Sequence, residues 1–171
     1  AELYNLFSGK KVLLIAPGVS ILTYEAKIKE FIKTENPVVI SINFVPESYL
    51  VDFAFFSNNK RFSNLENISC KTIITSNLIG KITDYKIDYN SLSGAFDQGC
   101  NSFIMILKLL KEMDTKAIYV AGADGYTENG KNYYTTNIRT YTEHGNKFNL
   151  AVANAIRNLD VRVAFLTPSA Y

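Results

Sequence analysis

A glycine turn follows the first apolar run of the sequence, and its residue types suit phosphate binding. The run from Val12 to Ala16 leads into Pro17, Gly18 and Ser20. Gly18 permits a positive φ or a close approach of another backbone, and Ser20 can cap a helix that begins beside it. Backbone N–H groups at a helix N-terminus attract phosphate. Because the stretch is not a complete dinucleotide-binding or Walker motif, a phosphate contact at Gly18 and Ser20 and a plain turn both stay open.

Polar side chains also stand where the next three apolar runs end. Asn43 lies near the end of the second run, Asn58 follows the third, and Ser76 and Asn77 follow the fourth. In an open parallel sheet these ends meet at one edge, which is where ligands bind. Asn and Ser are also ordinary turn residues, and that reading fits Ser76 and Asn77 best. We therefore expect Asn43 and Asn58 to contact a ligand.

The second half of the chain holds the other candidates. Gly99 precedes a strongly apolar helical pattern and offers a second helix N-terminus for an anion. Asp124 follows an apolar run over 117–121, where a ribose contact, a metal contact and a turn residue are equally good interpretations. Residues 126–144 are rich in tyrosine and polar residues. A loop of this length and composition is more often functional than a simple connection.

Hydrophobic periodicity predicts the elements that would bring these candidates together. Short apolar runs predict strands over 12–16, 38–44, 51–56, 71–75, 117–121 and 161–166. Helical spacing predicts helices over 21–33, 100–113 and 146–159, and 80–94 is expected to be a loop, with one short strand over 86–89. Since strands that are apolar on both faces suit the interior of a parallel sheet, we expect a Rossmann-like α/β fold: a mostly parallel open sheet with helices on both faces.

Composition narrows the class of protein. The chain of 171 residues, 47% of them hydrophobic, is long enough for one compact domain over 1–171 and too short for two. Its 18 basic and 16 acidic side chains nearly cancel, which argues against nucleic acid and anionic membranes as partners. Cys70, Cys100 and His144 have no spacing typical of a metal site, so we expect no metal and reduced, structural thiols. With no membrane-length apolar run and no signal-peptide pattern, we expect a cytoplasmic protein.

Three strand-end stretches resemble a known family. LIAPG at 14–18, VISINF at 39–44 and FFSNNKR at 55–61 look like the region that follows the catalytic barrel in bacterial 4-hydroxy-2-oxovalerate aldolase-like proteins. The resemblance spans nearly the whole chain and implies a C-terminal domain whose partner is an upstream barrel of about 250 residues. Metal-dependent aldolases of that family use a paired-histidine site, which a chain with only His144 cannot build. The resemblance therefore implies no aldolase active site within this chain.

The chain also resembles bacterial sialyltransferases that use a CMP-activated sugar. APGVS at 16–20 is similar to that family's Gly-Asn-Gly-Pro-Ser loop, and INF at 42–44 to its Cys-Asn-Gln-Phe segment. This implies nucleotide contacts by Asn43 and, by strand position, by Asn58. The strand and glycine that lead to Asp124 and Tyr126 are similar to the family's strand followed by Gly-Ile-Asp-Phe-Tyr.

The same resemblance implies catalytic roles. Tyr133 matches, with a one-residue insertion, a family tyrosine that helps to hold the leaving phosphate, and His144 matches the family's general base. A solvated bystander is the alternative for His144. The chain departs from the family at Pro17, which replaces the loop asparagine, and at Asp97-Gln98-Gly99, which replaces Thr-Ser-Gly and has no arginine before it. These departures count against sugar transfer more than against nucleotide binding.

We therefore expect a nucleotide- or nucleotide-sugar-binding module of an aldolase-like protein, with CMP or a nucleotide sugar as its ligand. Its expected binding residues are Gly18, Ser20, Asn43, Asn58, Gly99 and Asp124. One alternative is a CMP-sugar-dependent glycosyltransferase with His144, Tyr126 and Tyr133 as catalytic residues. Another is a docking or dimerisation module without a small ligand.

Overall fold

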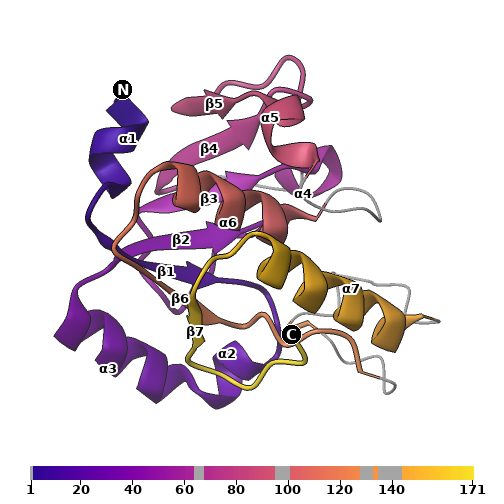
Figure 1. The fold of residues 1–171 in the computed structure, drawn as a ribbon. Helices are drawn as coiled ribbons and strands as arrows, with labels where there is room; N and C mark the ends of the chain where they lie inside the picture. The colour runs from indigo at the N-terminus through magenta and orange to yellow at the C-terminus, as the bar shows by residue number, and fades with distance from the viewer. Residues whose placement is uncertain (1, 64–67, 95–100, 128–132, 135–143) are drawn as a thin grey trace.

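The protein forms a seven-stranded parallel sheet in the computed structural model, which describes residues 2–63, 68–94, 101–127, 133–134 and 144–171 (Figure 1). The strand order is β5-β4-β3-β2-β1-β6-β7, and every neighbouring pair is parallel. The strands are β1 (Lys11–Ile15), β2 (Val38–Ile42), β3 (Phe53–Phe56), β4 (Lys71–Thr75), β5 (Tyr85–Ile87), β6 (Ala117–Ala121) and β7 (Val163–Phe165). The expected Rossmann-like α/β fold is confirmed.

Helices cover both faces of the sheet. They are α1 (Glu2–Phe7), α2 (Ser20–Thr23), α3 (Glu25–Glu35), α4 (Asn59–Ser63), α5 (Tyr89–Ser93), α6 (Ser102–Glu112) and α7 (Gly145–Asn158). Figure 1 shows α3 on one side of the sheet and α6 and α7 on the other. None of the helices among the described residues has the length and apolar character that a membrane crossing needs.

Several predicted boundaries need correction. The helix expected over 21–33 is two helices, because Tyr24 leaves helical geometry at φ −106° and ψ 23°. The strand expected over 86–89 lies at β5 instead, and Tyr89 already begins α5. The strand expected to run to Phe44 ends at Ile42, because Asn43 has the left-handed φ of 64°. The short helices α1, α4 and α5 were not predicted, since five or six residues are too few to establish helical periodicity.

The core explains why the strands are apolar throughout. Val12 and Leu14 of β1 pack on the face that carries α6 and α7, while Leu13 and Ile15 pack on the face that carries α3. All four side chains are fully buried. A central strand buried on both faces needs no alternation of polar and apolar residues. Cys70, a free thiol, packs against a third apolar cluster beside β3 and β4, and Cys100 lies outside the described residues.

The strand order reverses at β1, which lies between β2 and β6. From β1 the chain adds strands toward β5 in one direction and toward β7 in the other. In open α/β sheets the crevice at such a reversal, beyond the carboxyl ends of the strands, is the usual ligand site. The fold therefore places a candidate site beside the residues that follow β1, β2, β3 and β6.

Candidate functional site

A cavity of about 250 Å³ lies at this reversal, among the residues that follow four strands. Six of the predicted site residues line it: Gly18, Asn43, Asn58, Asp124, Tyr126 and Tyr133. The expectation that polar strand ends would meet at one edge of the sheet is met by these residues. These residues differ in their contacts, however, because some of their polar groups already bond other parts of the protein.

Asn43 has an acceptor that lacks a partner. Its backbone N–H donates to the Phe55 carbonyl at 2.9 Å, which continues the sheet register, and its left-handed φ of 64° is one that asparagine tolerates. The side-chain Nδ2 donates to Ser102 Oγ at 2.9 Å. The amide oxygen Oδ1 is buried and has no hydrogen-bond partner among the described residues. An unpaired buried acceptor costs about 1–3 kcal/mol, so this oxygen suits a donor from a ligand.

A hydroxyl pair orients the Asn43 amide. Ser57 Oγ, just after β3, hydrogen-bonds Ser102 Oγ at the start of α6. Asn77 supports this pair from the next strand, because its Nδ2 donates to the Ser57 carbonyl at 3.1 Å. Ser76 Oγ accepts from the N–H of Tyr89 at 2.9 Å. The turn interpretation of Ser76 and Asn77 is therefore confirmed: their side chains connect strand ends to neighbouring segments.

Positive charge lies on the same side of the cavity. The guanidinium of Arg61, on α4, is 6.0 Å from the ring centroid of Tyr133, within cation–π range. The N-terminus of α6 also opens here, with Ser102 and Phe103 in the lining and Asn101 as its cap, which accepts from Ile104 N–H at 3.1 Å. An arginine and a helix N-terminus both favour an anion. The helix start expected beside Gly99 thus lies a little further on, and Gly99 itself lies outside the described residues.

Gly18 and Asp124 are instead used to join the ends of β1 and β6. Gly18 N–H donates to the Gly122 carbonyl at 2.8 Å, and a Cβ on Gly18 would stand 2.2 Å from that oxygen. The Asp124 carboxylate accepts from Ser20 N–H at 2.8 Å and from Ser20 Oγ. The close approach predicted at Gly18 is therefore to the protein's own backbone.

Ser20 differs from its predicted role as a helix cap. Val19 is the N-cap of α2, and Ser20 is the first residue of that helix. Its N–H and hydroxyl both hydrogen-bond the Asp124 carboxylate, which lies where a phosphate was expected, and Ser20 does not line the cavity. The contacts of Gly18, Ser20 and Asp124 thus fit the turn interpretation.

Tyr126 is held in the cavity by α7. Asn149, which is 6% exposed, accepts from Tyr126 N–H through Oδ1 and donates to the Tyr126 carbonyl through Nδ2, both at 2.9 Å. The ring of Tyr126 meets that of Phe148 edge to face, with centroids 5.1 Å apart. Burial raises the pKa of the Tyr126 phenol far above its usual range, and a hydrogen bond with Tyr133 raises it further. The phenol is thus a protonated donor at neutral pH.

Tyr133 is held over the cavity by backbone pairing. It forms an antiparallel bridge with Gly18, and the next residue, Tyr134, donates its N–H to the Pro17 carbonyl at 3.0 Å. The Tyr134 ring packs on Phe44, with centroids 5.2 Å apart. Two consecutive tyrosines therefore serve different purposes, since one packs on the core beside Phe44 and the other lines the cavity.

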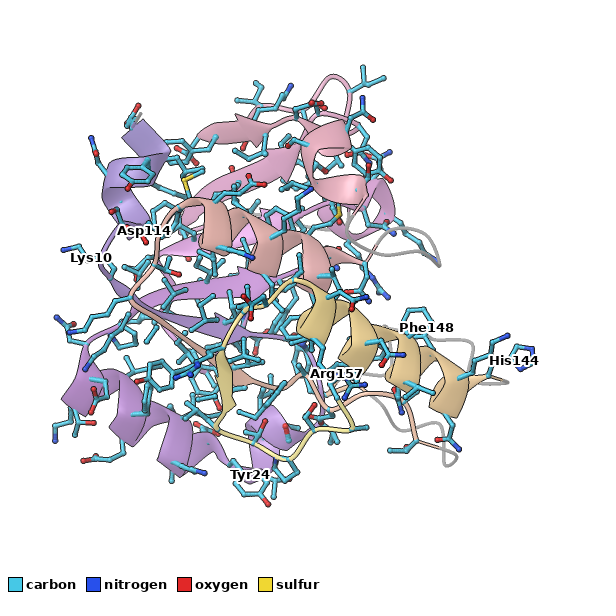
Figure 2. The ribbon with its side chains drawn as sticks, viewed as in Figure 1. Lys10, Tyr24, Asp114, His144, Phe148 and Arg157 are labelled. Atoms are coloured by element: carbon cyan, nitrogen blue, oxygen red, sulfur yellow. The ribbon has the colours of Figure 1, made fainter. Side chains whose placement is uncertain are left out.

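The backbone of His144 lies near Tyr126, because a Cβ on the next residue, Gly145, would stand 2.9 Å from Tyr126 Cβ. His144 is the exposed N-cap residue of α7, and it is not part of the cavity lining. Figure 2 shows its side chain at the outer end of α7, pointing away from the sheet, whereas Phe148 of the same helix lines the cavity. The side chain of His144 is thus exposed and outside the cavity lining, and its role as general base stays a prediction.

The lining includes residues that the sequence analysis did not name as site residues, among them Arg61, Ser102 and Tyr171. Arg61 could have been found from the sequence, because it follows Asn58 by three residues and therefore lies at the same edge of the sheet. Ser102 was hidden within a pattern that was treated only as a core helix. Tyr171 had no signal, because its place depends on how the chain returns after β7.

Comparison of the chain with protein-family models, with curated proteins and with solved structures found no match. The residues that the structure describes include no cluster of three or more side chains suited to hold a metal ion. The function is therefore argued from the cavity itself.

Proposed function

We propose that this protein binds a nucleotide or nucleotide sugar in the cavity beyond β1, β2, β3 and β6. The observation that carries the proposal is the buried Oδ1 of Asn43, which has no hydrogen-bond partner in the described part of the chain. The hydroxyls of Ser57 and Ser102 hold the amide with its nitrogen turned to the protein, so its oxygen is left for a ligand donor. A ribose hydroxyl or the amino group of a base supplies such a donor.

An anionic group on the ligand suits the other features of the cavity. Arg61 and the N-terminus of α6 supply positive charge, and the hydrogen-bonded phenols of Tyr126 and Tyr133 keep one hydroxyl hydrogen between them for a ligand. Asp124 also lines the cavity and keeps its negative charge, but its carboxylate is turned to the N–H and the hydroxyl of Ser20. A phosphate beside Arg61 and a ribose beside Asn43 together describe a nucleotide.

Glycosyl transfer is the second candidate, and one observation favours it. Tyr126 and Tyr133 both line the cavity, where two tyrosines that hold a departing phosphate would have to lie. The exposed position of His144 counts against it as the base. Transfer would need a base from another residue, so binding is the better-supported part of this hypothesis.

Two other expectations stay predictions. Attachment to an aldolase-like barrel rests on resemblance alone, and the full open reading frame upstream of this chain tests it. A docking module without a ligand has the least support. Leu50, Ile79 and Ile82 are 95%, 85% and 95% exposed, but single exposed apolar side chains are ordinary on protein surfaces.

Nucleotide binding is tested by calorimetric titration and thermal unfolding with CMP, CDP, UMP, AMP and GMP. Binding to the folded state stabilises it, by about 2.7 kcal/mol when the ligand is at 100 times its Kd. We expect at least one nucleotide to bind and to raise Tm. If no nucleotide binds at millimolar concentration, the proposal is wrong.

Asn43→Gly tests the residue on which the proposal rests. Glycine adopts a left-handed backbone freely, so this variant removes the amide without straining the turn, and we expect roughly tenfold weaker binding. Asn36→Gly is the matched control, because Asn36 has a φ of 45° at the exposed C-terminus of α3 and lies outside the cavity lining. Equal affinity of both variants for the nucleotide would contradict the assignment of Asn43.

A further inference from the structure

Hydrogen bonds from the segment after β7 hold Tyr171 in the cavity lining. Thr167 Oγ1 accepts from Gly122 N–H at 2.9 Å, just after β6. Ser169 Oγ donates to the Ala123 carbonyl at 2.6 Å and accepts from Tyr171 N–H at 3.1 Å. The backbone of Tyr171 is therefore tied, through one serine, to the segment that follows β6, and its side chain lines the cavity.

The ring of Tyr171 is held in place as well as its backbone. It stacks on Phe103 of α6, with centroids 5.9 Å apart and planes inclined by 23°, and Phe103 is 7% exposed. A Cβ built on Gly125 would lie 2.9 Å from Ala170 Cβ, so the segment that carries Tyr171 has no room to shift toward Gly125. A side chain fixed in this way presents its hydroxyl in one place, which lowers the entropy cost of binding a ligand there.

The hydroxyl of Tyr171 has no hydrogen-bond partner in the described part of the chain. The fully buried side-chain atoms without a partner there are Ser41 Oγ and Asn43 Oδ1, so the Tyr171 hydroxyl is not sealed off and stays open to the cavity that its side chain lines. Burial raises the pKa of the Tyr171 phenol far above its usual range, and Tyr133 and Asp124 add to that rise. At neutral pH the hydroxyl is therefore an unused hydrogen-bond donor.

Three phenols and one guanidinium gather at the same part of the cavity wall. The Tyr133 phenol hydrogen-bonds that of Tyr126 and also raises the pKa of Tyr171, so the three phenols lie close together. The Arg61 guanidinium is 6.0 Å from the ring centroid of Tyr133, and its charge opposes the rise in the pKa of Tyr126. The Tyr126–Tyr133 pair keeps one hydroxyl hydrogen and Tyr171 adds a second. Two such donors beside a cation suit the oxygens of one phosphate.

We propose that Tyr171 binds the phosphate of the ligand directly, by donating its hydroxyl hydrogen to a phosphate oxygen beside the Arg61 guanidinium. This inference rests on the proposed nucleotide binding, and it adds to the site a residue that the family resemblance does not include. The Asp124 carboxylate also lies near the Tyr171 phenol, but it faces the N–H and the hydroxyl of Ser20. A cation at position 171 would attract Asp124 away from Ser20, whereas a neutral phenol keeps its hydrogen for the ligand.

The first test compares the wild type and Tyr171→Phe in calorimetric titrations with CMP, UMP, AMP and GMP and with inorganic phosphate. Phenylalanine keeps the stack on Phe103 and removes only the hydroxyl, so we expect roughly tenfold weaker binding of nucleotide and of phosphate. Tyr134→Phe is the matched control, because Tyr134 packs on Phe44 outside the cavity lining and loses the same atom. If circular dichroism shows that Tyr171→Phe does not fold, Tyr171→Leu carries the same test, because it also lacks the hydroxyl and retains part of the packing on Phe103.

Phosphorus NMR of the bound ligand tests whether the contact is direct. A hydrogen bond to the phosphate dianion lowers the second pKa of the phosphate. We therefore expect the bound phosphate to have a higher second pKa in Tyr171→Phe than in the wild type, and Tyr134→Phe to leave it unchanged. A residue that only shapes the cavity would change the affinity without this rise in the pKa.

The outcomes separate this contact from the function on which it rests. A nucleotide that binds the wild type and Tyr171→Phe equally well overturns the contact and leaves nucleotide binding intact. Weaker binding with an unchanged pKa of the bound phosphate overturns the contact too. If no nucleotide binds, the proposed function is wrong and inorganic phosphate decides on the contact: weaker binding of phosphate to Tyr171→Phe supports it, and equal or absent binding overturns it as well.

Discussion

The two sides of the cavity use the same kinds of residues in opposite ways. At the ends of β1 and β6, Gly18 bonds the Gly122 carbonyl and Asp124 bonds Ser20, so the polar groups satisfy one another. At the end of β2, Asn43 keeps a buried oxygen without a partner among the described residues, and Arg61 lies beyond it after β3. The first side closes the sheet edge, and the second side is the one that we propose receives a ligand.

This difference shows that a polar strand end is not by itself a binding residue. Each β-strand end leaves backbone groups that need partners, and nearby side chains commonly supply them. Asp124 and Asn77 do so, whereas Asn43 is turned by Ser102 and Ser57 so that one atom is left over. Variants on the first side should therefore change stability, and variants on the second side should change binding.

Gly18→Ala is expected to have the largest effect on stability. The added Cβ would stand 2.2 Å from the Gly122 carbonyl oxygen and 2.6 Å from Asp124, and both are parts of a fixed turn. We expect a loss of about 3 kcal/mol in the free energy of unfolding, measured by urea denaturation. Gly94→Ala is the control, because a Cβ there meets nothing within 4 Å. A loss at Gly18 no larger than at Gly94 would show that the two turns are not tightly packed.

Asp124→Ala is expected to cost less, about 2 kcal/mol, because it removes charged hydrogen bonds without adding a clash. Ser20→Ala removes only the bond to the hydroxyl, so its cost should be smaller. The double variant should cost less than the sum of the two single variants, since both act on one contact. Strict additivity in denaturation would mean that the carboxylate does not hold Ser20 in solution.

The gathering of residues at one edge could be predicted, because it follows from short apolar runs in a parallel sheet. The strands over 71–75 and 117–121 have the predicted bounds. It could not be predicted which of these residues bond other parts of the protein, because that depends on contacts such as the one between Ser20 and Asp124, which are 104 positions apart in the chain. Local sequence carries no signal for a partner at that distance.

Resemblance to a family had the same limit. It pointed to Asn43, Tyr126 and Tyr133, which do line the cavity, and to His144, which does not. The position of His144 follows from where α7 begins and in which direction it leaves the sheet, neither of which a motif records. Arg61 lines the cavity from the short helix α4, and Tyr171 lines it from the segment after β7. Hydrophobic periodicity detects neither segment.

Tyr49→Phe tests, at alkaline pH, a contact next to the first side of the cavity, which is formed by the ends of β1 and β6. Tyr49, 6% exposed, donates its hydroxyl hydrogen to the Ile21 carbonyl of α2, and burial, with a smaller effect of Glu25, raises its pKa to about 12. The unfolded phenol loses its proton near pH 10 while the folded one keeps it, so stability falls as pH rises from about 10 through 12. Tyr49→Phe should cost about 1 kcal/mol at neutral pH and lose less stability over that alkaline range. Equal pH dependence of the two proteins in denaturation would contradict the assignment, and Tyr4→Phe serves as the control.

Asn58→Asp should leave stability almost unchanged and still weaken binding. Asn58 lines the cavity after β3, and its Oδ1 accepts from Lys60 N–H at 2.9 Å at the start of α4. Aspartate makes the same contact equally well, so the free energy of unfolding should change by less than about 0.5 kcal/mol. The new carboxylate would lie in the same cavity as Arg61 and would repel the phosphate of the ligand. This repulsion should weaken CMP binding by roughly tenfold, more at low salt than at high salt. Unchanged affinity at low salt, measured by titration, would place the phosphate away from this end of the cavity.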